Sequence, residues 1–253
     1  MATRAERERE KKASLLAAAE EVFTSKGYTD ATLDEIIKLA DTGKGTVYRY
    51  FGNKENLFYQ LVLGKHQALM EDLWALARRE SCGVPERMRL LSRRWLRFLT
   101  ENKVLWPVVG NEMAGMNKGV VGDRQPDGTY RQYVRWGPMP LPEKLAEMQR
   151  YQEMINEEAE PLAAVYREGV EQGLFRRSAQ HQDIAYHLFF GMAMVLFLHP
   201  DPERVFRRGG QGSAGLTLDE LADNVITHFL FGMVDPAKRD ALEVADHPSS
   251  PRA

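Results

Sequence analysis

Hydrogen-bond donors, cations and phenolic hydroxyls are concentrated in one short stretch, residues 44–51, with the sequence KGTVYRYF. If this stretch is a helix, Val47 and Phe51 stand four residues apart and point inward together. The opposite face then carries the polar side chains of Lys44, Thr46, Tyr48, Arg49 and Tyr50. A small exposed helix of this kind fits the major groove of DNA, which is about 12 Å wide. The residues therefore predict a helix that contacts base edges and phosphates.

A second short helix and a tight turn must hold this face in place. Thr32 can cap the helix start with its hydroxyl, and Glu35, three residues later, completes a capping box. Apolar side chains then recur at helical spacing, at Leu33, Ile36, Ile37 and Ala40. Residues 41–43 break that pattern, so residues 32–57 predict a helix-turn-helix.

The segments on either side are predicted to brace this motif. Residues 4–12 form a mixed-charge arm that we expect to be partly disordered. Its basic side chains are expected in solvent, with contact to DNA phosphates as the less favoured alternative. A helix over residues 13–25 should end at Gly27. After Gly52, Asn53 should cap a long helix that runs to about Arg79.

Composition and charge limit the classes of function. The chain of 253 residues is 43% hydrophobic and can bury a sizeable core, and its formal net charge of -2 means that any contact with nucleic acid must come from a local basic surface. The single cysteine, Cys82, cannot form an internal disulfide or a thiolate metal cluster, which suits a reducing compartment. We see no apolar secretion signal, and the longest apolar run, residues 188–198, is too short to span a membrane. We therefore expect a cytoplasmic protein without membrane contact.

The remainder of the chain is predicted to be helical, with no convincing strand. After a joint over residues 81–85, an amphipathic helix over residues 86–100 should carry its arginines largely outward, in solvent or in salt bridges. A loop-like segment, residues 115–142, precedes a helix that starts near Glu143 and ends at Gly173. Pro161 should kink or break that helix.

The last third of the chain completes a predicted all-α fold. Residues 181–199 are apolar nearly all round, as in a buried helix, and Thr217 with Glu220 should cap a final helix. We expect residues 1–52 to form an N-terminal three-helix helix-turn-helix DNA-binding domain. Residues 53–235 should form a larger helical domain for ligand binding and dimerisation, and residues 236–253 a flexible tail.

The stretch DTGKGTVYRYFGNKENLF, residues 41–58, resembles the signature of the tetracycline-repressor (TetR) family of bacterial transcriptional regulators. The matching part runs from about Ala13 to Val62. The family positions fall on Lys44, Gly45, Thr46, Tyr48, Phe51, Lys54, Glu55 and Leu57. The turn departs from the family's Gly-Val-Ser, because Gly43 stands where the family has serine. Glycine still serves as a helix cap but cannot make the contact of a serine hydroxyl.

The resemblance implies a role in DNA binding for individual residues of the helix-turn-helix. Thr32 and Lys54 would bind phosphate, and Gly45 would let the helix approach DNA closely. Three side chains would reach base edges: Lys44, Thr46 and Tyr50. Tyr48 would contact phosphate and lay its ring against sugar or a thymine methyl, and Arg49 completes the DNA-binding face. The alternative is that Tyr48 and Tyr50 are half-buried core aromatics.

The resemblance also implies a homodimer, because one helix-turn-helix reads too few base pairs and paired half-sites of a palindromic operator need a symmetric protein. Residues 181–199 and 217–231 are the candidates for pairing into a four-helix bundle. The predicted interface residues are Phe189, Met192, Val195, Leu196, Leu221, Val225 and Phe229. The alternative is that both helices belong to the core of one subunit.

An effector pocket is the third expectation from the resemblance. Large or pliable side chains would surround a cavity for a small, largely apolar or aromatic ligand that releases a repressor from its operator. The candidate residues are Trp95, Phe98, Trp106, Met113, Tyr151, Met154 and Phe190. Each of them alone is more typical of a core position.

Other classes of function find less support in the sequence. None of the common hydrolase, phosphate-loop or dinucleotide motifs is present, so we expect no enzyme and no cofactor. His181, Asp183 and His187 could suggest a metal pair, but the histidines are six residues apart and do not share a helix face, so no metal site is predicted. A helical protein that binds small molecules or partners without binding DNA remains the alternative, favoured only by the unusual turn at residues 41–43.

Overall fold

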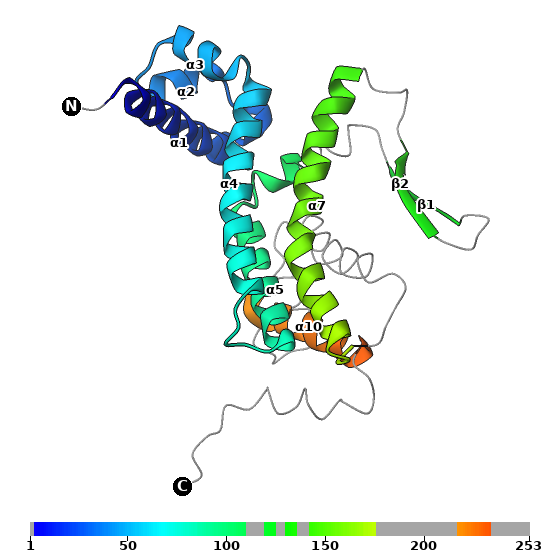
Figure 1. The fold of residues 1–253 in the computed structure, drawn as a ribbon. Helices are drawn as coiled ribbons and strands as arrows, with labels where there is room; N and C mark the ends of the chain where they lie inside the picture. Colours follow the sequence, from blue (N-terminus) through cyan, green and yellow to red (C-terminus); the bar gives the residue numbers. More distant parts are fainter. Residues whose placement is uncertain (1–2, 110–118, 125–129, 136–141, 176–216, 234–253) are drawn as a thin grey trace, which may run out of the picture. The chain divides into compact units, whose positions relative to one another are not determined.

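The computed structural model describes residues 3–109, 119–124, 130–135, 142–175 and 217–233. The described helices are α1 (Arg4–Asp30), α2 (Leu33–Leu39), α3 (Lys44–Phe51), α4 (Lys54–Ala77), α5 (Val84–Glu101), α7 (Pro142–Glu171) and α10 (Leu218–Met233). Figure 1 shows α1, α2 and α3 grouped around the start of α4. The predicted all-α class and the N-terminal helix-turn-helix are confirmed.

One β-hairpin interrupts this helical fold. Strand β1 (Gly119–Arg124) pairs antiparallel with β2 (Tyr130–Arg135), so that Gly119 lies opposite Arg135. The prediction of a loop over residues 115–142 was therefore wrong for these two segments. Both strands contain β-branched or aromatic residues, which favour extended backbone, among glycines that had suggested a loop.

The chain divides into two compact units. The first comprises residues 1–67 and 102–154, and the second residues 68–101 and 155–253. Helices α4 and α7 each begin in the first unit and end in the second. The boundaries predicted at residues 52 and 235 separate functional domains, whereas the two units are defined by contacts within the chain. These boundaries therefore stay a prediction.

Helix α1 starts earlier than the sequence indicated. The Thr3 hydroxyl accepts a hydrogen bond from the Glu6 amide at 3.2 Å, and the Glu6 carboxylate accepts one from the Thr3 amide. This capping box stabilises a helix from Arg4 onward, so the expectation of a partly disordered arm over residues 4–12 was wrong. Gly27 has φ of 80° and interrupts the helical backbone at the predicted position.

The core of the first unit forms under α1 and the start of α4. The apolar face of α1 is buried at Leu15, Ala18, Ala19, Val22 and Phe23. The Phe23 ring lies 5.4 Å from Phe58 of α4, and Tyr28 contacts both rings, at 5.6 and 4.9 Å between centroids. This aromatic cluster fixes the end of α1 against α4.

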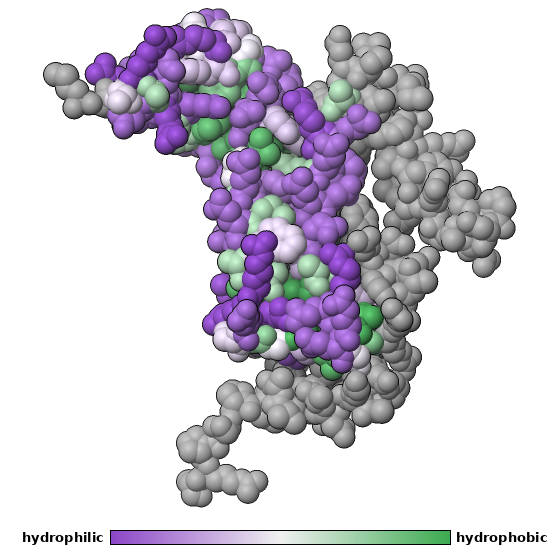
Figure 2. Space-filling view, in the orientation of Figure 1, coloured by the Kyte–Doolittle hydropathy of each residue, from purple (hydrophilic) through white to green (hydrophobic). Residues whose placement is uncertain are grey.

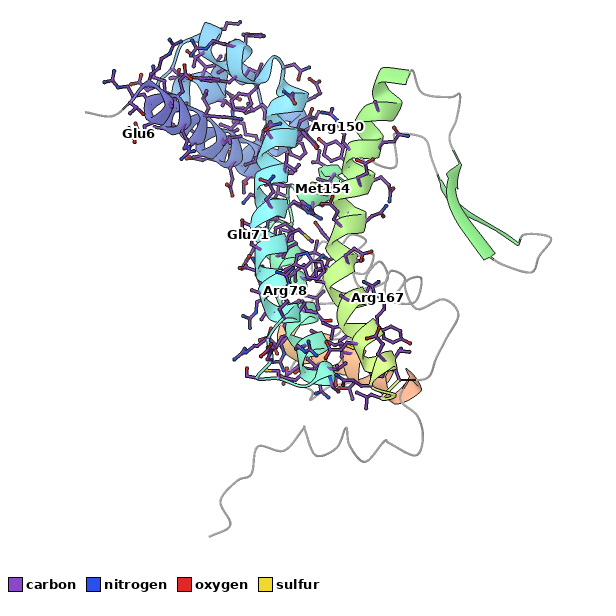
Figure 3. The ribbon with its side chains drawn as sticks, in the orientation of Figure 1. Glu6, Glu71, Arg78, Arg150, Met154 and Arg167 are labelled. Atoms are coloured by element: carbon purple, nitrogen blue, oxygen red, sulfur yellow. The ribbon has the colours of Figure 1, made fainter. Side chains whose placement is uncertain are left out.

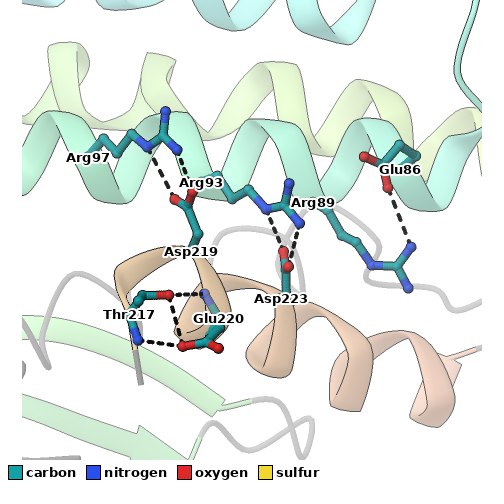
Figure 4. A network of polar contacts seen from close by, with 8 residues as sticks. All are labelled: Glu86, Arg89, Arg93, Arg97, Thr217, Asp219, Glu220 and Asp223. Atoms are coloured by element: carbon teal, nitrogen blue, oxygen red, sulfur yellow. Dashed lines mark hydrogen bonds and ion pairs between the residues drawn. The ribbon is translucent and has the colours of Figure 1, made fainter. Parts of the chain in front are cut away.

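In the second unit, α10 packs along α5 through paired charges (Figure 4). The Arg93 guanidinium donates to both carboxylate oxygens of Asp223, with Nε to Oδ1 at 2.6 Å. One turn further along α5, Arg97 donates to both oxygens of Asp219, with Nε to Oδ1 at 3.1 Å. Bidentate pairs of this kind fix geometry as well as adding energy, and they set the register between the two helices.

Two other arginines of α5 were predicted outward and are not. Arg87 and Arg89 are only 8% and 4% exposed. Each has a carboxylate partner, Glu168 for Arg87 and Glu86 for Arg89, at 3.6 Å in the second case. The prediction of salt bridges along this helix is confirmed, and the prediction that these two side chains lie outward is wrong.

The ends of α7 and α10 follow their sequence signals. Helix α7 continues through Pro161, so the predicted break there was wrong. The helix ends before Gly173, whose φ of 68° suits a residue without Cβ. Before α10, the Thr217 hydroxyl accepts a hydrogen bond from the Glu220 amide at 3.2 Å, which confirms the predicted capping box. Hydrogen bonds from the Thr217 amide and hydroxyl lower the pKa of Glu220.

Candidate nucleic-acid interface

The start of α2 is fixed by its own first turn. The Thr32 hydroxyl accepts a hydrogen bond from the Glu35 amide at 3.3 Å, and the Glu35 carboxylate accepts one from the Thr32 amide at 3.2 Å. Glu35 also pairs with Lys26 of α1, and this contact is the main cause of a pKa below the ordinary value for Glu35. The predicted capping box is confirmed, and the Lys26–Glu35 contact joins α2 to α1.

The turn into α3 is made without a side-chain cap. Asp41 adopts φ of 46°, which is the left-handed region that favours glycine. Gly43 is the N-cap of α3 and makes no side-chain hydrogen bond, while its carbonyl accepts from the Thr46 amide at 2.9 Å. The predicted loss of a capping hydroxyl at position 43 is therefore real, and α3 still begins at Lys44.

Helix α3 has one buried and one exposed face. Val47 and Phe51 are 0% and 2% exposed, as predicted, whereas Tyr48 is 47% exposed. Tyr48 is therefore no core aromatic, while Tyr50 is half-buried. Lys44, Gly45 and Arg49 are exposed, and Thr46 is half-buried. The face that could meet DNA is thus presented by the first unit, and Figure 2 shows a largely hydrophilic surface over α1–α3.

Two polar contacts hold side chains of this face in place. The Arg49 guanidinium donates to the Tyr50 hydroxyl at 2.9 Å and lies 4.8 Å from the centroid of the Tyr50 ring. The Lys44 ammonium lies 3.4 Å from a carboxylate oxygen of Asp34 on α2. Both contacts are at the surface, where they cost little to exchange for contacts with a ligand.

Lys54 is engaged within the chain. Its ammonium donates to the carbonyl oxygens of Tyr28, Thr29 and Ala31 at 2.9, 3.3 and 3.0 Å. These carbonyls follow the interruption at Gly27, where α1 leaves acceptors without helical partners. The three contacts use the three N–H groups of the ammonium. The sequence did not predict these hydrogen bonds, because the acceptors lie 23 to 26 residues away from Lys54.

Beyond its chain neighbours and the backbone of its own helix, a Cβ atom added at Gly45 would meet no atom within 4 Å, so packing does not require glycine there. The same holds at Gly43. Asp34, which holds Lys44, was not predicted as part of the site. Nothing in the local sequence marks it, since a first-turn aspartate is also an ordinary helix-start residue.

The predicted effector residues divide between the two units. Trp106, Tyr151 and Met154 are buried in the first, and Figure 3 labels Met154 on α7, as it does Arg150 one turn earlier. Arg150 lies 4.5 Å from the ring centroid of Tyr59, and Tyr59 packs edge-on against Tyr151. These contacts fit a core as well as a pocket wall.

The other effector candidates lie in the second unit or outside the described residues. Trp95 and Phe98 are buried there, and the Trp95 indole N–H donates to the buried Glu158 carboxylate at 2.9 Å. Met113 and Phe190 lie outside the described residues. A common cavity for the set stays a prediction.

Most of the predicted dimer interface also lies outside the described residues, at Phe189, Met192, Val195 and Leu196. Of the α10 candidates, Val225 is half-buried, while Leu221 and Phe229 lie in the helix and their side chains are not described. Two other α10 residues, Ala222 and Ile226, are both 0% exposed. Pairing with a second copy stays a prediction.

Membrane-spanning helices and metal clusters are two further features that the described residues would show. No described helix combines the length and apolarity that a membrane-spanning segment needs. Among the described residues, no three histidine, cysteine or acidic side chains are grouped so that they could hold a metal ion. His181, Asp183 and His187 lie outside the described residues.

Comparison with protein families matches residues 15–61 to the model described as bacterial regulatory proteins, tetR family. An HTH-type transcriptional regulator of Bacillus subtilis (strain 168), YhgD, is 46% identical over 52 residues, 21% of this chain and 27% of the relative. The HTH-type transcriptional regulator QacR of Staphylococcus aureus is 36% identical over 63 residues, 25% of this chain and 33% of the relative. The sequence match therefore spans a third or less of either relative's length.

Solved structures extend the likeness of fold to most of the chain. A TetR-family transcriptional regulator from Mesorhizobium loti MAFF303099 has a TM-score of 0.61 at 20% identity, covering 92% of this chain and 100% of that one. The regulator FadR from Bacillus subtilis, in complex with stearoyl-CoA, has a TM-score of 0.60 at 17% identity, covering 87% and 98%. At these identities the likeness shows the fold alone.

Proposed function

We propose that this chain, which matches the tetR family of bacterial regulatory proteins over residues 15–61, is a sequence-specific DNA-binding transcriptional regulator. The observation that carries the proposal is the exposed face of α3. Its cations and phenols are presented outward on a helix whose inner face, Val47 and Phe51, is fully packed. A rigid helix with an outward polar face is what major-groove reading requires.

The assignment of roles follows the geometry of this face. Lys44, Thr46, Arg49 and Tyr50 are the proposed base and phosphate contacts, with Tyr48 against the sugar-phosphate backbone. The open space beside Gly45 supports a close approach of DNA, because packing within the chain does not require glycine there. Thr32 and Lys54 are proposed near phosphate, Thr32 through the amides at the start of α2. Lys54 would also position α3 by tying α4 to the end of α1.

The rest of the proposal concerns assembly and control. We take residues 1–52 as the DNA-binding domain, residues 53–235 as the effector-binding and dimerisation domain, and residues 236–253 as the tail. The protein would act in the cytoplasm as a homodimeric repressor on a palindromic operator, without enzymatic activity. A small, largely apolar or aromatic effector would release it from DNA. The bound effector would favour a distance between the two DNA-binding domains of the dimer that no longer fits the operator. The FadR structure with stearoyl-CoA is one solved example of this fold with a bound small molecule.

A pair of charge-matched variants tests DNA binding. Arg49→Gln and Arg79→Gln each remove one positive charge, but Arg49 lies on α3 and Arg79 lies just beyond α4. We expect Arg49→Gln to weaken binding to duplex DNA by about tenfold and to reduce the slope of affinity against salt by about one. Arg79→Gln should bind as the natural chain does.

Fluorescence anisotropy on labelled duplexes, at several salt concentrations, measures both quantities. Equal affinities for the two variants would contradict the assignment of α3 as the DNA-reading helix. Far-UV circular dichroism of each variant checks that helicity is kept.

A further inference from the structure

A separate pocket lies in the second unit, where α4 ends, α5 begins and α7 passes. It is open to solvent and has a volume of about 610 Å³. Its walls include Trp74, Arg78, Cys82, Arg87, Ala164 and Glu168. None of the predicted effector residues lines it. The volume is in the range of small-molecule sites.

Arg87 is the more deeply buried of the two arginines that line this pocket. Its side chain is 9% exposed, and two of its nitrogens are engaged, Nη1 with the Ala77 carbonyl oxygen at 2.8 Å and Nη2 with the Glu168 carboxylate. The third nitrogen, Nε, is buried and has no hydrogen-bond partner among the described residues. A buried donor without an acceptor costs free energy, and an acceptor supplied by a ligand would recover it.

Arg78 supplies a second cation at the rim. Figure 3 labels it just beyond the end of α4, and its guanidinium carbon lies 5.0 Å from the ring centroid of Trp74. No described residue accepts a hydrogen bond from this guanidinium, which leaves its donors available. The stacked indole limits the directions that the guanidinium samples.

Two carboxylates line the pocket: that of Glu80 is exposed, and that of Glu168 is engaged. The Glu168 carboxylate accepts from Arg87 and from the Gln172 amide, the latter at 2.8 Å, and the Arg87 contact lowers the pKa of Glu168. Glu168 therefore stays ionised and paired. Beside Arg87, away from the exposed Glu80, the unmet capacity is that of a donor, next to an apolar wall formed by Ala77, Val84, Ala164 and Val165.

We propose that this pocket binds a small organic carboxylate with a compact apolar or aromatic body. Its carboxylate would accept hydrogen bonds from Arg87 Nε and from Arg78, and its body would cover the alanine and valine wall. Carboxylate oxygens match the planar donor geometry of guanidinium groups better than a neutral acceptor does. The proposal does not depend on DNA binding, because it concerns contacts within the second unit alone.

Cys82 provides a native reporter of occupancy. It is the chain's single cysteine, is half-buried and lines the pocket, so a bound ligand should shield its thiol. The rate of reaction with N-ethylmaleimide, an uncharged reagent, is followed by intact mass. Three probes of matched shape are compared at constant ionic strength: 2-naphthoate, 2-naphthamide and 2-naphthamidine, which are anionic, neutral and cationic.

We expect 2-naphthoate to slow the reaction, by about tenfold at ten times its dissociation constant, because the unliganded fraction falls in that proportion. The neutral and cationic probes should have little effect. Reaction of free glutathione under the same conditions corrects for direct effects on the reagent. Equal protection by the three probes, or protection by none, would overturn the proposal.

Variants separate binding in the pocket from binding elsewhere. Arg78→Gln removes the rim cation, and Ala164→Leu fills the pocket from α7 without changing charge; both should abolish protection by 2-naphthoate. Arg79→Gln, next to Arg78 but outside the pocket lining, should keep it. Protection that survives Ala164→Leu in a folded variant would also overturn the proposal, because the ligand would then lie elsewhere.

Discussion

The Lys54 ammonium lies 2.9 Å from the carbonyl oxygen of Tyr28 and 4.7 Å from the centroid of that residue's ring. One side chain at the start of α4 thus both caps the end of α1 and stacks on its last aromatic. The family resemblance assigns Lys54 to phosphate, but the geometry gives it a structural task as well. Any phosphate contact must share an ammonium whose N–H groups already have acceptors.

Replacing Lys54 should therefore affect stability as well as DNA affinity. We expect Lys54→Met to lower the free energy of unfolding by about 2 kcal/mol, since hydrogen bonds from a charged donor are lost and carbonyls are left without partners. Lys11→Met, an exposed lysine of α1, should change it by less than about 0.5 kcal/mol. Urea unfolding followed by circular dichroism measures both, and equal effects would contradict the structural task.

Asp41, in the turn before α3, should give a variant that is more stable than the natural chain. Asp41 has φ of 46°, a region that costs a residue with a side chain about 1 kcal/mol relative to glycine. Asp41→Gly should therefore stabilise the chain by up to about 1 kcal/mol, and Asp41→Ala should destabilise it. Thermal unfolding ranks the three proteins. A ranking with the alanine variant above the glycine variant would show that the turn does not hold this backbone.

The two bidentate pairs between α5 and α10 should differ in strength. Side chains of the Arg93–Asp223 pair are 30% and 31% exposed, against 55% and 39% for Arg97–Asp219. Solvent screens the second pair more, so its coupling energy should be below about 0.5 kcal/mol and that of the first about 1 kcal/mol. Double-mutant cycles with alanine measure both energies. A larger coupling for Arg97–Asp219 would contradict the ranking by burial.

The Arg87–Glu168 pair should make the stability of the fold depend on pH in the acidic range. Arg87 lowers the pKa of Glu168 in the folded chain below its ordinary 4.5. The stabilisation is then complete above about pH 4.5 and is lost as pH falls through the lower folded pKa. The difference in melting temperature between the natural chain and Glu168→Gln should shrink from pH 7 to pH 3. A difference that grows toward acid would contradict the pair as described.

Much of the candidate interface was predictable because its signals are local. The capping box at Thr32, the helix start at Lys44 and the inward pair Val47 and Phe51 each depend on residues within a few positions of one another. The same holds outside the interface for the capping box at Thr217. Patterns of that range can be recognised without knowing the fold.

The features that were missed depend on partners far along the chain. Arg87 is buried because Glu168, 81 residues later, neutralises it, and Lys54 turns inward because α1 leaves carbonyls without partners. The hairpin of β1 and β2 was missed because its glycines favoured a loop. Burial of a charge cannot be predicted until its partner is placed.

Selection of bound sequences from random duplex DNA tests the central claim most directly. The account predicts that the natural chain enriches a palindromic consensus with half-sites about one helical turn or a multiple apart, while Tyr48→Ala, at equal helicity, enriches it weakly or not at all. Tyr48 is the right residue for this test because it is exposed on α3 and is not required by the core. Absence of any enriched sequence with the natural chain would contradict the account and favour a helical protein that binds other molecules.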